Sequence, residues 1–148
     1  MSNKIIHKTM IINAAPQKVW QVLLDTPYIE EWYTEFGEGL TAETDWSPGS
    51  KYRVVDHKGF GMIGRIAENI PLKTLSIEAQ GMVTDNKDDF ESDIAKQIKG
   101  NRETYWLSET AEGTKLDIES GCVEEYADMM ADMWDKALIK IKQLSENS

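Results

Sequence analysis

The sequence predicts an α+β fold in which a long C-terminal helix packs across a curved antiparallel sheet. Two patterns support this prediction. From Val123 to Leu144, apolar residues recur at helical spacing, which places them on one face of a helix. From Leu40 to Gly121, apolar and polar residues alternate, and Gly and Pro interrupt them about every eight to twelve residues, as in an antiparallel meander. The length of 148 residues suits one domain covering residues 1–148.

One strand and two short helices are predicted at the N-terminus. Ile5–Asn13 is rich in β-branched and apolar residues, as strands are. Pro16 follows shortly, and its fixed φ suits the first position of a helix. Asp25-Thr26-Pro27 ends that helix, and a second helix extends from there to about Glu35.

Six further strands bring the predicted sheet to about seven strands. The sixth strand is ambiguous, because both of its faces carry an aromatic residue. The favoured interpretation directs Tyr105 and Leu107 toward the core and Trp106 outward. The six strands are Leu40–Thr44, Lys51–His57, Met62–Asn69, Thr74–Gln80, Glu103–Glu109 and Lys115–Gly121.

An insertion at residues 81–100 separates two of these strands and is too long for a simple turn. Phe90, Ile94 and Ile98 recur there at helical spacing behind Asp85-Asn86, which indicates a short helix. The favoured interpretation is an acidic surface insertion, because the apolar stripe is thin. The alternative is a lid over the mouth of a pocket.

The C-terminal helix, about 33 Å long, is the clearest predicted element. Acidic residues such as Asp128 and Asp132 occupy its early turns, and lysines such as Lys140 and Lys142 occupy its late turns. This order matches the helix dipole and supports the prediction by a few tenths of a kcal/mol or more per residue.

Several short motifs resemble one branch of a known superfamily. The matching segments are Ala15–Leu23, Pro27–Tyr33, Pro48–Arg53, Gly64–Ile66, Gly113–Leu116 and Trp134–Leu138 with Leu144. Together they resemble the START-like (SRPBCC) superfamily with its helix-grip fold, in the branch of heat-shock-protein-90 ATPase activator homologues. Two features depart from that pattern: Gly49-Ser50 replaces a glycine pair, and the 81–100 insertion is longer and more acidic.

The resemblance implies a cavity between the sheet and the C-terminal helix. Across the superfamily such cavities hold lipids, sterols, polyketides and other largely apolar molecules. Aromatic and methionine side chains suit this role, although a dry core uses them as well. The predicted ligand-binding residues are Trp32, Phe36, Tyr52, Met62, Leu75, Ile77, Tyr105, Ile118, Met130, Met133 and Trp134.

The sequence holds no catalytic, metal-binding or cofactor motif. His7 and His57 are its only histidines, and neither has a second ligand at metal-binding spacing. Cys122 is the only cysteine and lacks a CxxC partner. We therefore predict no catalytic residues, no metal and no cofactor, and a protein that is more plausibly not an enzyme.

The net charge of −10, from 26 acidic and 16 basic residues, opposes binding to nucleic acid or to anionic membranes. No apolar run approaches the roughly 20 residues of a membrane-spanning helix, and no secretory signal is recognisable, so we expect a cytoplasmic protein without membrane insertion.

Three functions remain open. The first is binding of a small hydrophobic or amphipathic ligand in the cavity, with polar groups such as Arg53, Arg65, Tyr105 or Glu103 orienting it. The second is a protein-interaction module of the co-chaperone type, marked by an exposed Trp106 or Trp46. The third is an enzyme of the cyclase or dehydratase type, which would need a buried acid or a tyrosine pair in the cavity.

Overall fold

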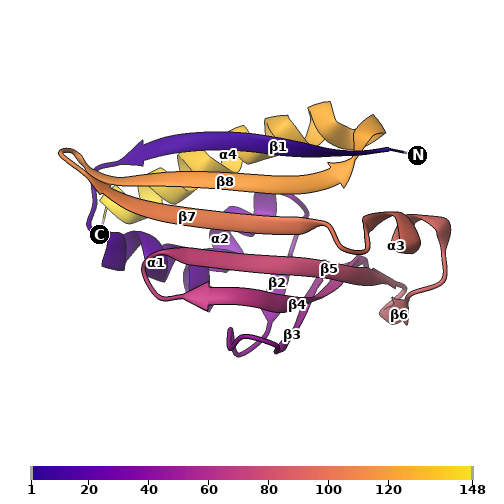
Figure 1. Cartoon of the computed structure of the whole chain (residues 1–148). Coiled ribbons are helices and arrows are strands. Elements are labelled where there is room, and N and C mark those ends of the chain that lie inside the picture. Colours follow the sequence, from indigo (N-terminus) through magenta and orange to yellow (C-terminus); the bar gives the residue numbers. More distant parts are fainter. Residues whose placement is uncertain (1, 148) are drawn as a thin grey trace.

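The computed structural model describes residues 2–147 and confirms the predicted α+β architecture. Its sheet has the strand order β1-β8-β7-β5-β4-β3-β2, every neighbouring pair is antiparallel, and the short β6 pairs with β5 (Figure 1). The eight strands are β1 Asn3–Ile12, β2 Thr41–Glu43, β3 Lys51–Val55, β4 Gly61–Ile70, β5 Thr74–Thr84, β6 Lys87–Asp89, β7 Arg102–Thr110 and β8 Gly113–Val123.

Two helices and a 3-10 turn follow β1, as predicted: α1 (Pro16–Leu24), α2 (Thr26–Trp32) and η1 (Tyr33–Glu35). A proline lies in the first turn of each α-helix, where its missing N–H costs no helical hydrogen bond. The indole Nε1 of Trp32 donates to the carbonyl oxygen of Val22 over 2.9 Å and so ties α2 to α1. Trp32 and Tyr33 are thereby held against the sheet.

The long helix α4 (Ala127–Glu146) begins a few residues later than its apolar pattern predicts. Val123 remains in β8, where it pairs with Asn3, and Glu124–Tyr126 forms the 3-10 turn η2. The physical reason is that β1 extends far enough to pair with the last residues of β8. In Figure 1, α4 runs along the sheet behind β1 and β8, and it also contacts α1 and α2.

The insertion contains an eighth strand that the sequence pattern did not reveal. Asp85 and Asn86 both have positive φ and form a two-residue turn between β5 and β6, so they do not begin a helix. The helix α3 (Asp93–Ile98) comes later, capped by Ser92, whose hydroxyl accepts from the backbone N–H of Ala95 over 3.2 Å. β6 and α3 lie together at one end of the sheet (Figure 1).

Two register irregularities in the β4–β5 pair give the sheet its curvature. The register shifts between Ile63 and Gly64 and again between Ile66 and Glu68. Such bulges bend a strand and increase its twist. The core lies between this curved sheet and the helices.

Candidate functional site

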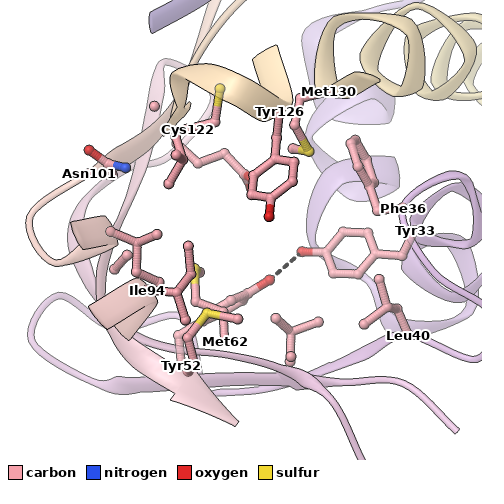
Figure 2. Close-up of a pocket in the computed structure, with 18 of the residues that line it drawn as sticks. Tyr33, Phe36, Leu40, Tyr52, Met62, Ile94, Asn101, Cys122, Tyr126 and Met130 are labelled. Carbon is pink, nitrogen blue, oxygen red and sulfur yellow. Dashed lines mark hydrogen bonds between the residues drawn. The ribbon is translucent and has the colours of Figure 1, made fainter. Parts of the chain in front are cut away.

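A cavity of about 390 Å³ lies between the sheet, η1, α3 and the first turns of α4. Most of its wall is apolar, and Figure 2 shows side chains from these separate elements turned toward one space. Phe36 and Leu40 approach from one side, Met62 and Ile94 from another, and Met130 comes from α4. The volume falls within the range of about 300–1,000 Å³ that small-molecule sites occupy.

The rest of the space under α4 is filled by an aromatic cluster. The ring of Trp134 lies 4.9 Å from Phe36, 5.9 Å from Tyr105 and 6.3 Å from Trp32, measured between ring centroids. Trp32, Tyr105 and Trp134 are each only 1% exposed. The aromatic cluster therefore closes one end of the cavity and separates it from the solid core.

Tyr33 and Tyr52 form a hydroxyl pair in the cavity wall. Their oxygen atoms are 2.8 Å apart, and either hydroxyl can be the donor (Figure 2). Burial raises the pKa of Tyr33 far above its usual range, and the nearby Glu103 charge raises it further. Burial likewise raises the pKa of Tyr52. Both side chains are thus neutral hydrogen-bond donors at physiological pH.

Glu103 is the only carboxylate in the cavity wall, counting residues 2–147. One of its oxygens, Oε2, accepts a hydrogen bond from the Tyr105 hydroxyl over 2.5 Å. Burial raises the pKa of Glu103, and the hydrogen bond from Tyr105 offsets only part of that increase. The half-buried carboxylate still reaches the space of the cavity.

The cavity wall carries no Lys, Arg or His among the described residues. Arg53 and Arg65 lie outside it: Arg53 forms an ion pair with Asp88 (3.6 Å) and Arg65 with Glu78 (3.0 Å). A buried carboxylate without a cation repels a second anion strongly, because charges interact more strongly at low dielectric. The cavity is therefore suited to neutral or cationic molecules.

The structure brings together only part of the predicted ligand-binding set. Trp32, Phe36, Tyr52, Met62 and Met130 line the cavity. The other six residues do not line the cavity. Met133 is half-buried on α4, one turn past Met129 at the cavity rim. The remaining five belong to the solid core: Leu75, Ile77, Tyr105, Ile118 and Trp134.

The cavity also includes residues outside the predicted set. The sequence pattern gives Tyr33 no role in a site, and it names Glu103 only among the polar groups that could orient a ligand. Strand parity could have revealed Glu103, because an inward Tyr105 on β7 also places position 103 inward. Cys122 lies in the same wall, and burial raises the pKa of its thiol.

The insertion contributes directly to the cavity through α3. Ile94 and Ile98, two members of its predicted apolar stripe, line the wall. Phe90, the third member of that stripe, does not line the cavity and is 49% exposed. The insertion therefore forms part of the cavity wall, and the lid stays an alternative hypothesis.

Glu103→Gln should stabilise the protein at high pH. A carboxyl whose folded-state pKa is raised contributes most stability below its unfolded pKa, about 4.3, and loses that contribution as pH rises through the folded-state pKa. We expect Glu103→Gln to raise the free energy of unfolding at pH 8, because the neutral amide removes the cost of burying a charged carboxylate. Urea unfolding at pH 4, 6 and 8 measures this.

Glu109→Gln, on the exposed part of the same strand, is the matched control. It should change the free energy of unfolding by less than about 0.5 kcal/mol at each pH. The increase in the free energy of unfolding caused by Glu103→Gln should become smaller toward pH 4. Destabilisation by Glu103→Gln at pH 8 would contradict this account of the site.

A curved antiparallel sheet gripped by a long C-terminal helix over an apolar cavity defines the START-like, helix-grip class of domain. The family model described as "Activator of Hsp90 ATPase homolog 1-like protein" matches residues 13–146. The chain belongs to this family, as its motifs suggested. A domain of this family is suited to binding a small molecule or a protein partner. Comparison with curated protein sequences finds no match.

Solved structures show the same fold. The protein MLL2253 of Mesorhizobium loti is similar with a TM-score of 0.76 and 19% identity, over 95% of this chain and 96% of that chain. The Aha1 dimer of Colwellia psychrerythraea is similar with a TM-score of 0.70 and 18% identity, over 99% of this chain and 98% of that chain. CalU16 of Micromonospora echinospora is similar with a TM-score of 0.63 and 20% identity, over 95% of this chain and 72% of that chain. At these identities the similarity establishes the fold alone.

Residues 2–147 also lack the features of two other kinds of site. No helix in this range is long and apolar enough to cross a membrane. Within the same range, no three His, Cys, Asp or Glu side chains are grouped so that they could hold a metal ion.

Proposed function

We propose that this protein binds a small, mostly apolar, uncharged molecule whose single polar end lies against Tyr33, Tyr52 and Glu103. The observation that carries the proposal is the 390 Å³ cavity, whose wall is mostly apolar and includes Glu103 and the hydrogen-bonded Tyr33–Tyr52 pair. Burial of apolar ligand surface contributes roughly 25 cal/mol per Å², and the polar groups fix the orientation.

The negative charge of Glu103 disfavours anionic ligands. An ionised fatty acid would bring a second carboxylate to Glu103 without any cation in the described wall to neutralise it. An alcohol or a ketone can instead accept a hydrogen bond from the tyrosine pair. Neutral ligands are therefore favoured over fatty acids of the same chain length.

A matched pair of probes tests this selectivity. Octan-1-ol and octanoate share their chain and differ in the polar end. In a two-dimensional NMR titration, octan-1-ol should shift amides of β3, β4 and the first turns of α4, and octanoate should bind at least about tenfold more weakly, a difference of about 1.4 kcal/mol. Equal or tighter binding of octanoate would contradict the proposed charge selectivity.

Met130→Trp should block the cavity. Met130 is half-buried and its side chain points into the space from α4, so a larger ring there removes volume that the ligand needs (Figure 2). We expect the affinity for octan-1-ol to fall by at least about tenfold, measured by the same titration. The control is Ile139→Trp on the exposed face of the same helix, where the residue is 51% exposed. Equal affinity in both variants would rule out this cavity as the binding site.

A protein-interaction module of the co-chaperone type is the second candidate. Trp106 is 37% exposed on the outer face of the sheet, close to Ile5, which is 66% exposed. Trp46 is half-buried and lies 5.9 Å from the ring of Tyr52, so it is less available to a partner. If this function holds, the protein should accelerate ATP hydrolysis by purified Hsp90, and Trp106→Ser should abolish the acceleration. An unchanged hydrolysis rate with the unaltered protein would exclude it.

A further inference from the structure

Several free polar groups remain in the cavity wall. Nδ2 of Asn101 has no hydrogen-bond partner within residues 2–147. In the Tyr33–Tyr52 pair one hydroxyl donates to the other, which leaves a second proton without an acceptor among residues 2–147. The Tyr105 hydroxyl is already used by Oε2 of Glu103. Oε1 of Glu103 accepts no hydrogen bond within that same range. A donor and an acceptor therefore remain for the molecule in the cavity.

The tyrosine pair and Glu103 line the wall of the same cavity. The charge of Glu103 contributes to the raised pKa of both Tyr33 and Tyr52. A hydrogen bond donated within a chain also polarises the next hydroxyl and makes it a better donor. In an apolar cavity such a donor stabilises a developing negative charge on oxygen more than it would in water.

We propose that Glu103 and the Tyr33–Tyr52 pair form a proton-transfer site that enolises small, neutral ketones bound in the cavity. This inference rests on the binding function proposed above. The ketone oxygen accepts a hydrogen bond from the free tyrosine hydroxyl, and the carbon beside the carbonyl faces Oε1 of Glu103. Tyr105 is a positioning residue, because it holds the carboxylate through Oε2.

The reaction is balanced without any other reagent. For a β,γ-unsaturated ketone, Oε1 of Glu103 removes a proton from the carbon between the carbonyl and the C=C bond. The electrons of the broken C–H bond form a new C=C bond to the carbonyl carbon, and the carbonyl π electrons move to oxygen. Glu103 then returns the proton to the γ-carbon, which restores the carbonyl and leaves the conjugated isomer.

The environment suits Glu103 to this role. A general base works best when its pKa lies near the operating pH, and burial moves the pKa of Glu103 upward in that direction. No histidine can substitute for it. His7 lies 3.5 Å from Asp117 on β8, and His57 lies exposed beside Gly39, so neither belongs to the cavity wall.

The test uses cyclohex-3-en-1-one, whose conjugated isomer cyclohex-2-en-1-one absorbs more strongly in the ultraviolet. The unaltered protein should accelerate the isomerisation above the rate in buffer alone. Glu103→Gln should lower kcat/KM by at least about 100-fold, the lower range for loss of a general base. The double variant Tyr33→Phe with Tyr52→Phe should lower it by about 100-fold, as does loss of an oxyanion donor.

A second ketone shows whether a variant changes the reaction rate or the affinity for the ketone. The compound 2,2,6,6-tetramethylcyclohexanone has no hydrogen on the carbons beside its carbonyl, so it can bind but cannot react. Its NMR titration should give nearly the same affinity with Glu103→Gln as with the unaltered protein. Glu109→Gln, on the exposed part of β7, should leave both binding and kcat/KM unchanged.

Each outcome decides something different. Loss of isomerisation in Glu103→Gln with ketone binding retained supports the proton-transfer site. If the ketones bind but the unaltered protein is no faster than Glu103→Gln, the inference is overturned and the binding function stands. If neither the ketones nor octan-1-ol binds, the binding function and the inference both fail.

Discussion

Replacing Trp134 by alanine should lower the free energy of unfolding by about 3–5 kcal/mol, the range for large aromatic side chains removed from a core. Trp134 is 1% exposed and its ring contacts Trp32, Phe36 and Tyr105, which come from two other parts of the chain. Urea unfolding measures the loss. The melting temperature should fall by about 10 °C, because 1 kcal/mol corresponds to about 2–4 °C at this chain length.

Two matched variants show whether the loss comes from these ring contacts. Trp134→Phe keeps an aromatic ring and removes an indole N–H that has no hydrogen-bond partner within residues 2–147, so it should cost clearly less than the alanine variant. Met133→Ala changes the half-buried neighbouring position and should cost less than about 1.5 kcal/mol. A loss for Trp134→Ala no larger than for Met133→Ala would contradict the proposed role of the aromatic cluster.

Gly61→Ala should destabilise the protein by about 3 kcal/mol, in the upper range for overpacked sites. A Cβ atom at position 61 would lie 1.7 Å from the carbonyl oxygen of Val54 and 2.9 Å from Cα of Val55. These are backbone atoms of the neighbouring strand, so β3 and β4 would have to separate locally. Thermal and urea unfolding measure the effect.

Gly49→Ala is the control that shows how much of the loss at position 61 comes from steric overlap and how much from backbone strain. Gly49 has a φ of +88°, but no atom lies within 4 Å of the position that its Cβ would take. The cost should therefore be the conformational strain alone, about 1 kcal/mol. Equal losses in the two variants would show that the close approach of β3 and β4 does not determine the effect at position 61.

The fold could be predicted because its strongest signals are local. The apolar stripe of α4 and the alternation of Leu116 and Ile118 with charged residues along β8 each follow from the period of one element. The start of α4 was misplaced because β1 holds Val123 in the sheet by pairing with it through Asn3, and long-range pairing is not visible in helical periodicity. The same limit hid β6, whose turn residues Asp85 and Asn86 resemble a helix start.

The cavity was less predictable than the fold, because the same residue types fill a core and line a pocket. Ile77 and Met62 both occupy inward strand positions, yet only Met62 reaches the cavity. The difference depends on where α4 and α3 leave space over the sheet, which no single element determines. The polar contact between Tyr33 and Tyr52 joins η1 to β3, and neither segment alone indicates it.

Cys122 gives this chain a built-in chemical handle. It is the only cysteine in the sequence, and its thiol lies in the cavity wall at 7% exposure. A small apolar maleimide can therefore label one defined position from the inside, without any substitution. Because a molecule bound in the cavity would shield the thiol, the rate of labelling would measure how much of the protein has an occupied cavity.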